Sequence, residues 1–379
     1  MKSAFHVMAK PISNNCNIDC EYCFYIDNDE SLSNSKAMDE KTLTKFITRY
    51  IKEQPSTVLD INFAWQGGEP TLLGLDYFKK VVEIQKKVAG LDYHKVSNSF
   101  QTNGILINQE WCDFFRENNF LVGISVDGDE QQHNTYRRTR SGKGTYSIVK
   151  DTISLMISNG VMVNALCVLN NVNVKQPLRT YEAIKALGIK HIQFIPLVEK
   201  HVRGAEKIIA TTGSFVTEKS VGAVEYGRFL VEVFEEWREH DFREVIINDF
   251  ESYLSILIHQ VPLNCFSMSN CGSNLVVESD GSVYSCDHFV EHDYRLGNVN
   301  QFEFEKLVQK KQHKNFKSLN QKSSDCFSCE WLKLCQGGCP AHRDKMNKNA
   351  NHLCAGYKLF FEHAIPRLES IPAEQHKFL

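Results

Sequence analysis

Apolar runs and amphipathic stretches alternate along the first half of the chain, in units of roughly 35 residues. The apolar runs predict strands at residues 4–9, 58–65, 96–102, 120–126, 161–169 and 191–197. Apolar residues at helical spacing predict helices at 43–51, behind an N-cap at Asp39, and at 77–84, 109–118, 146–158 and 178–187. This order is typical of a parallel sheet with helices outside it.

The pattern changes after about residue 200. Residues 200–222 are polar and have no clear period, which indicates a linker or mobile loop. Helices are expected at 224–240 and 249–260, and apolar residues on both sides of Asp280-Gly281 predict a hairpin. We therefore expect an α/β domain at 1–222, a helical connection at 223–262, and a last domain at 263–379 that ends in a helix.

Composition narrows the class of protein. The 379 residues are 42% hydrophobic and 23% charged, and 43 basic against 46 acidic side chains leave a net charge of −3. We expect no nucleic-acid partner and no membrane partner, because there is no basic excess and no apolar run of about 20 residues. The first ten residues lack the apolar run of a signal peptide, so we expect a cytoplasmic protein.

Thirteen cysteines are unusual for a cytoplasmic protein unless most of them bind metal. Cys16, Cys20 and Cys23 form the pattern C-x3-C-x2-C in a loop just past the first strand. Three thiolates can hold a [4Fe–4S] cluster whose fourth iron stays open to a small chelating ligand. Zinc and disulfide bonding are the alternatives, but zinc prefers four ligands and nothing else indicates secretion.

Eight more cysteines lie between residues 265 and 354. Cys265, Cys271 and Cys286 flank the predicted hairpin, and the dense run Cys326, Cys329, Cys335 and Cys339 is followed by Cys354. Eight thiols make two complete sets of four, enough for two fully ligated clusters, and two zinc ions are the alternative. Cys112 and Cys167 stand apart, and we expect both to be small buried residues.

Polar motifs follow several predicted strands directly. Gln66-Gly67-Gly68-Glu69-Pro70, Gln101-Thr102-Asn103-Gly104 and Ser125-Val126-Asp127-Gly128 all begin near a strand's carboxyl end. Function gathers at that edge of a parallel sheet. With the cysteines, these motifs resemble the radical S-adenosylmethionine enzymes that carry a C-terminal SPASM domain, and within them the anaerobic sulfatase-maturating enzymes. The segment Val277-Glu278-Ser279-Asp280-Gly281-Ser282-Val283-Tyr284-Ser285-Cys286-Asp287 carries the same resemblance.

The resemblance implies a partial parallel (β/α)6 barrel at 1–222 and a SPASM domain at 263–379. It also implies the cofactors, S-adenosylmethionine and three [4Fe–4S] clusters. The catalytic cluster would be held by Cys16, Cys20 and Cys23. One auxiliary cluster would take Cys265, Cys271, Cys286 and Cys339, and the other would take Cys326, Cys329, Cys335 and Cys354.

Further site residues are implied in the same way. Gln66, Gly67, Gly68, Glu69, Gln101, Asn103 and Ser125 would bind S-adenosylmethionine, with Glu69 suited to its ammonium group. Arg137, Arg138 or Arg140 would meet its carboxylate, or all three would belong to a solvated loop. Asp287 would be the general base, with His288 as the alternative, and Tyr25 would line the active site. His133 is expected on a surface loop.

The reaction implied is oxidation of a sulfatase's active-site cysteine or serine to Cα-formylglycine, started by a 5′-deoxyadenosyl radical that takes a Cβ hydrogen. The partners implied are an unfolded sulfatase polypeptide and reduced flavodoxin or ferredoxin as electron donor. Two alternatives stay open. One is a radical enzyme that cross-links or epimerises a ribosomally made peptide. The other is a zinc-stapled scaffold or an electron carrier without turnover.

Overall fold

The computed structural model of the chain describes residues 4–25, 36–200, 216–344 and 347–370. The described residues form two compact units, each assembled from separate stretches of the chain. The first unit comprises Met1–Ser125, Arg137–Val163 and Asn270–Leu319. The second comprises Val126–Tyr136, Asn164–Ser269 and Asn320–Leu379.

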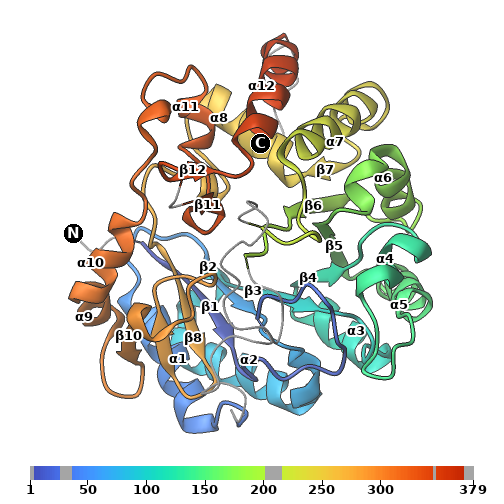
Figure 1. Cartoon of the computed structure of the whole chain (residues 1–379). Coiled ribbons are helices and arrows are strands. Elements are labelled where there is room, and N and C mark those ends of the chain that lie inside the picture. Colours follow the sequence, from blue (N-terminus) through green and yellow to red (C-terminus); the bar gives the residue numbers. More distant parts are fainter. Residues whose placement is uncertain (1–3, 26–35, 201–215, 345–346, 371–379) are drawn as a thin grey trace. The chain divides into compact units, whose positions relative to one another are not determined.

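A mostly parallel sheet forms the centre of the first unit. Its strands, in spatial order, are β10 (Arg295–Asn298), β9 (Ser282–Tyr284), β8 (Asn274–Glu278), β1 (His6–Lys10), β2 (Ile61–Trp65), β3 (Val96–Thr102) and β4 (Phe120–Ser125). The run from β8 to β4 is parallel, whereas β9 and β10 pair antiparallel. The predicted hairpin therefore exists, and its first strand lies beside the N-terminal strand (Figure 1).

Amphipathic helices bury their apolar faces in the first unit. They are α1 (Glu40–Glu53), α2 (Leu75–Ala89), α3 (Gln109–Glu117), α5 (Tyr146–Ser158), α9 (Phe304–Val308) and α10 (Lys311–Ser318). The predicted N-cap of α1 is confirmed, because the Asp39 carboxylate accepts a hydrogen bond from the Thr42 amide at 2.7 Å. One turn further on, Phe46 packs edge-on against Phe63 and Trp65 of the sheet, which fixes α1 over β2.

The second unit contains its own parallel strands, β5 (Met162–Leu169), β6 (His191–Pro196) and β7 (Ile246–Ile247). Its helices are α4 (Glu130–Tyr136), α6 (Pro177–Lys185), α7 (Ala223–Glu236), α8 (Asn248–His259), α11 (Leu332–Cys335) and α12 (Cys354–Glu369), and β11 (Arg343–Asp344) pairs with β12 (Ala350–Asn351). Helices α7 and α12 cross where Gly227 meets Gly356, and a Cβ on Gly227 would lie 2.6 Å from the Gly356 carbonyl oxygen. Only glycine allows this approach.

The strand and helix predictions are confirmed within a few residues at each end, and no closed barrel is found among the described strands. Helix α4 was not predicted, and it corrects one expectation: His133 lies in α4 and is fully buried, not on a surface loop. Its Nδ1 accepts a hydrogen bond from the Asp127 amide. Residues 201–215 of the predicted linker lie outside the described residues.

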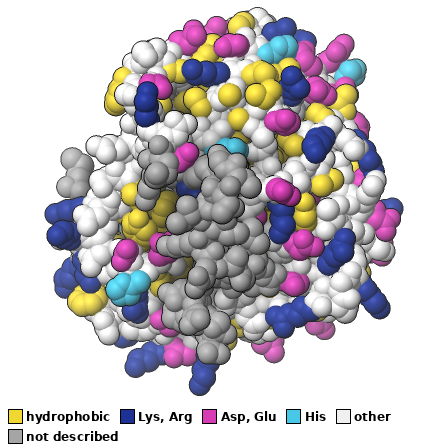
Figure 2. Space-filling model, viewed as in Figure 1, with side chains coloured by type: hydrophobic (Ala, Val, Ile, Leu, Met, Phe, Trp, Pro, Cys, Tyr) yellow, Lys and Arg dark blue, Asp and Glu magenta, His cyan; other side chains and the backbone are white. Residues whose placement is uncertain are grey.

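The surface agrees with the balanced charge of the sequence. On the face drawn in Figure 2, basic and acidic side chains are interspersed, and neither gathers into one large patch. No helix among the described residues is long and apolar enough to cross a membrane.

Candidate active site and cluster-binding cysteines

The predicted catalytic cysteines lie on a tight loop that follows β1. The loop is closed by hydrogen bonds from the Ser13 amide to the Lys10 carbonyl, at 3.0 Å, and from the Cys23 amide to the Cys20 carbonyl, at 3.0 Å. None of these three cysteines is in a disulfide bond. Burial, Glu69 and Cys23 raise the pKa of Cys16 to about 11, so this thiol is neutral at neutral pH unless a cation stabilises its thiolate.

Gly67 and Gly68 bring the end of β2 against this loop. The Gly68 amide donates to the Ser13 carbonyl at 2.6 Å, and the Glu69 amide donates to the Asn15 carbonyl at 2.9 Å. A Cβ on Gly68 would lie 1.9 Å from the Asn15 carbonyl oxygen, which no side chain tolerates. Glycine is therefore required here for the approach of two backbone segments.

Glu69 is completely buried, and its carboxylate is held by the chain itself. One oxygen accepts from the Thr71 amide and hydroxyl and from the Thr102 hydroxyl, at 2.6–3.0 Å. The other accepts from the Asn103 amide at 2.7 Å. Burial nonetheless raises the pKa of Glu69 above its ordinary value, although these four donors oppose the shift. The side chain thus ties the end of β2 to the end of β3.

Asn103 carries this tie to the cysteine loop. Its side-chain nitrogen Nδ2 donates to Asn17 Oδ1 at 2.7 Å and to Cys16 Sγ at 3.7 Å. On the opposite flank, Arg137 donates to Cys20 Sγ at 3.8 Å, and Arg140 donates to the Cys16 carbonyl at 2.6 Å. Arg137 therefore supports the cysteine loop from a buried position, whereas Arg138 and Arg140 are exposed, as expected for a solvated loop.

Tyr25 and Asp287 come together around a lysine that the motifs do not single out. Lys10 Nζ forms an ion pair with Asp287 Oδ1 and lies 3.4 Å from the centre of the Tyr25 ring. The Tyr25 hydroxyl donates to Glu278 at 2.6 Å. Burial raises the pKa of Asp287, but Lys10 and His288 outweigh it, and the pKa lies below its ordinary value.

Glu278 is the second residue that sequence reasoning missed. It receives hydrogen bonds from Tyr25 and from the Ser13 hydroxyl, the latter at 2.7 Å. Burial raises its pKa above the ordinary value against the effects of Lys10, Tyr25 and Ser13. The sequence does contain a signal for both missed residues. Glu278 and Lys10 each place a charged group at the end of an apolar strand, where a buried charge needs a partner.

The other predicted pocket residues lie at the strand ends where the motifs place them. Gln66 follows β2, Gln101 lies in β3, and Ser125 ends β4 and is buried. His288, the alternative base, stacks on the ring of Phe24 with 5.4 Å between ring centres. Cys112 and Cys167 are both fully buried, as expected.

Four of the late cysteines gather in the second unit. Burial raises the pKa of Cys335 to about 11, and Cys354, Cys326 and Cys329 act on it electrostatically. The structure thus groups these four, which spacing alone does not pair. Of the other predicted set, Cys271 and Cys286 lie in the first unit and Cys265 and Cys339 in the second.

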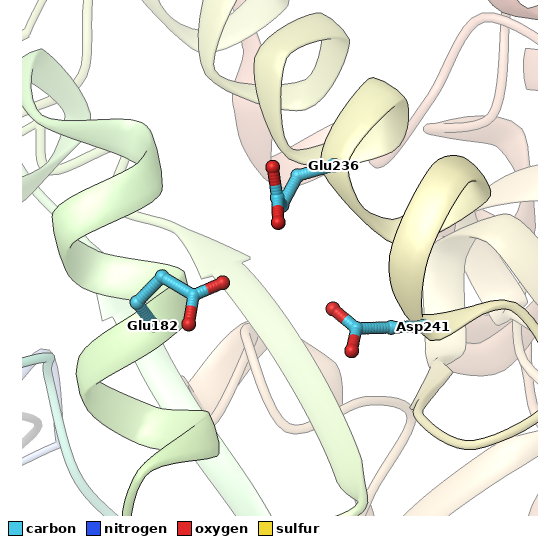
Figure 3. Close-up of side chains that lie close together, drawn as sticks. All are labelled: Glu182, Glu236 and Asp241. Carbon is cyan, nitrogen blue, oxygen red and sulfur yellow. The ribbon is translucent and has the colours of Figure 1, made fainter.

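An acidic cluster in the second unit offers a different kind of ligand. The carboxylates of Glu182, Glu236 and Asp241 face one another, with one oxygen of each within 4.8 Å of the others (Figure 3). Lys185 already bridges two of them, with Nζ 2.7 Å from Glu182 and 2.8 Å from Asp241. Tyr181 also donates to Asp241 at 2.8 Å. The cluster is therefore accounted for by ion pairs and hydrogen bonds.

Comparison with known proteins identifies the class. Residues 11–184 match the radical SAM superfamily, and residues 265–337 match the iron-sulfur cluster-binding SPASM domain. The chain belongs to this class of radical S-adenosylmethionine proteins. Solved structures of Streptococcus suis SuiB with precursor peptide SuiA share the fold at a TM-score of 0.64 and 14% identity.

Within this class, the similar proteins include anaerobic sulfatase-maturating enzymes. The serine-type anaerobic sulfatase-maturating enzyme of Bacteroides thetaiotaomicron is 35% identical over 97% of this chain and 91% of its own. The cysteine-type enzyme of Clostridium perfringens is 34% identical over 96% of this chain and 97% of its own. A structure of anSMEcpe with AdoMet and the Cp18Cys peptide matches all of both chains, with 32% identity and a TM-score of 0.87. The chain belongs to the anaerobic sulfatase-maturating enzymes.

Proposed function

We propose that this chain oxidises the active-site cysteine or serine of a sulfatase polypeptide to Cα-formylglycine. The observation that carries the proposal is that Tyr25, just after the cysteine loop of a radical S-adenosylmethionine fold, meets Asp287 around Lys10. Both residue types are included as substrates, because serine-type and cysteine-type relatives match almost equally well.

The residues present fit the implied cofactors. Three cysteines without a disulfide bond share one short loop, and the raised pKa of Cys16 means that a metal's charge would favour its thiolate. Cys16, Cys20 and Cys23 would hold the catalytic cluster. The S-adenosylmethionine pocket would be lined by Gln66, Gly67, Gly68, Glu69, Gln101, Asn103 and Ser125. Glu69 would contribute by holding the backbone amides of Thr71 and Asn103 in place with its carboxylate.

The late cysteines complete the set of metal ligands. One auxiliary cluster would be held by Cys326, Cys329, Cys335 and Cys354, a group supported by their electrostatic interaction. The other would be held by Cys265, Cys271, Cys286 and Cys339, and this set rests on the family resemblance. Clusters with four protein ligands have no open iron, so they would supply an electron acceptor and not a substrate site.

When bound, the catalytic cluster and S-adenosylmethionine supply a radical that takes one hydrogen atom from the substrate's Cβ. Asp287, ionised beside Lys10, accepts the remaining proton. Loss of a hydrogen atom, a proton and an electron yields the aldehyde from serine directly. Cysteine gives a thioaldehyde, which water converts to the aldehyde with release of hydrogen sulfide. Tyr25, fixed by Glu278, forms part of the wall beside Asp287.

The electron donor we propose is a small one-electron carrier, reduced flavodoxin or ferredoxin, and the sulfatase enters as an unfolded polypeptide. Thirteen cysteines without a disulfide bond need a reducing compartment, which favours the cytoplasm.

The test is anaerobic incubation with cysteine-type and serine-type sulfatase peptides. Mass spectrometry is expected to find a loss of about 18 Da from cysteine or about 2 Da from serine, as aldehyde formation requires. Asp287→Asn should still cleave S-adenosylmethionine but lose product about 100-fold, since a neutral amide cannot take the proton. Cofactor cleavage without change in either peptide contradicts the proposed substrate, and unchanged product from Asp287→Asn contradicts the base.

A further inference from the structure

Two buried carboxylates share one ammonium group in the first unit. Lys10 is the last residue of β1, and Glu278, the last residue of β8, is its partner in the parallel register. Asp287 follows the same hairpin nine residues later along the chain. The Lys10 side chain is only 2% exposed, so its charge acts with little screening from water.

The two carboxylates have different partners. Glu278 receives hydrogen bonds from two hydroxyl groups, those of Tyr25 and Ser13, in addition to the nearby charge of Lys10. Asp287 Oδ1 is buried and has the Lys10 ammonium as its ion-pair partner. Lys10 therefore determines the position of Asp287 more than that of Glu278.

The exposure of Asp287 is one-sided. The oxygen paired with Lys10 is buried, whereas 21% of the side chain as a whole remains accessible. An ion pair on one side holds the carboxylate in place and leaves its other side open to an arriving group. The Tyr25 ring lies on the same ammonium, so one lysine fixes both residues relative to each other.

We propose that Lys10 is a positioning residue of the oxidation, which aims the Asp287 carboxylate at the substrate and seats Tyr25 beside it. Glu278 fixes Tyr25 from a second direction, because it accepts a hydrogen bond from the Tyr25 hydroxyl while Lys10 lies over the face of the ring. The proposal rests on the proposed function, since it gives Lys10 no role apart from Asp287.

A double-mutant cycle tests this proposal. Lys10→Met keeps the length of the side chain and removes its charge, Lys10→Arg keeps the charge, and Asp287→Asn is combined with Lys10→Met. The matched control is Lys45→Met, because Lys45 is a half-buried lysine of the same unit that donates to the Asn300 carbonyl. Formylglycine and 5′-deoxyadenosine are measured together, and melting temperature and peptide affinity are measured without S-adenosylmethionine.

Lys10→Met should lower kcat for the aldehyde at least tenfold with little change in KM, and more 5′-deoxyadenosine should form per aldehyde. Lys10→Arg should recover part of the loss, and the double variant should be no slower than Asp287→Asn alone. Additive losses in the double variant, or wild-type kcat in Lys10→Met, overturn the proposal. If the wild-type chain makes no aldehyde while cleaving S-adenosylmethionine, the proposed function itself is wrong.

Loss of a buried cation can also prevent folding. In that case Lys10→Met is combined with Glu278→Gln, which keeps the same net charge in the buried group as the wild-type chain. This variant still contains Asp287, so the proposal expects it to fold and to make little aldehyde. A folded variant with wild-type kcat overturns the proposal.

Discussion

Single side chains of this protein owe their roles to neighbours that are distant in sequence. The motif containing Cys286 predicts Asp287 as a site residue, whereas Lys10 belongs to no motif and is marked only by its place at the end of an apolar strand. Only the structure brings the two together. Glu69 shows this in part, because two of its four donors are on nearby Thr71 and the other two are on Thr102 and Asn103 at the end of another strand.

Asp249 is a buried carboxylate in helix α8 of the second unit. One of its oxygens accepts a long hydrogen bond from Asn264, at 3.4 Å, and Oδ2 has no hydrogen-bond partner among the described residues. Burial raises the pKa of Asp249 from 3.8 to about 7. The folded chain therefore binds this proton more tightly than the unfolded chain does.

This shift gives a stability prediction with a definite sign. Between pH 3.8 and about 7 the unfolded chain has lost the proton and the folded chain has not, so the free energy of unfolding falls as pH rises. Asp249→Asn removes this contribution. The melting temperature of the wild-type chain should fall more between about pH 6 and about pH 8 than that of Asp249→Asn.

The control is Asp76→Asn, since the Asp76 side chain is 97% exposed. That variant should keep the wild-type pH dependence. Equal pH dependence of the melting temperature in all three proteins would show that Asp249 is ionised in the folded chain.

The strands and helices were largely predictable because each depends on its own apolar period. Helix α4 was missed because Glu130–Tyr136 is polar along most of its length and offers no such period. The pairing of β8 with β1 could not be predicted, since more than 260 residues separate Lys10 from its partner Glu278. That pairing nevertheless places Lys10 beside Glu278.

The contact between the end of β2 and the cysteine loop gives a prediction for iron content. In Gly68→Ala the new methyl group would meet the Asn15 backbone, which can give way only by moving the loop. Three clusters contain about twelve irons. The variant should therefore lose the catalytic cluster and keep about eight of these irons. Iron and sulfide analysis after anaerobic reconstitution measures this.

Gly74→Ala is the matched control. A Cβ on Gly74 has open space around it within 4 Å, although the positive φ of +78° makes the substitution strained. It should lower the melting temperature slightly and keep the full iron content. A Gly68→Ala protein with the full iron content would contradict the role assigned to this contact.

Taken as a whole, the chain combines a site for starting a radical reaction with cysteines suited to removing an electron. The number of clusters could be predicted from eleven cysteines, because three thiols leave one iron open and eight make two closed sets. The assignment of each late cysteine to a set could not, because spacing does not reveal which loops meet. The grouping of Cys335 with Cys326, Cys329 and Cys354 emerges only in the structure.

Removal of a hydrogen atom from the substrate's Cβ is the step that separates this oxidation from epimerisation, which breaks a Cα–H bond. A sulfatase peptide whose target cysteine carries deuterium at Cβ, incubated anaerobically with S-adenosylmethionine, isolates that step. We expect one deuterium in 5′-deoxyadenosine, and formylglycine in the peptide. Deuterium absent from 5′-deoxyadenosine while the cofactor is cleaved, or present without any aldehyde, would contradict the proposed reaction.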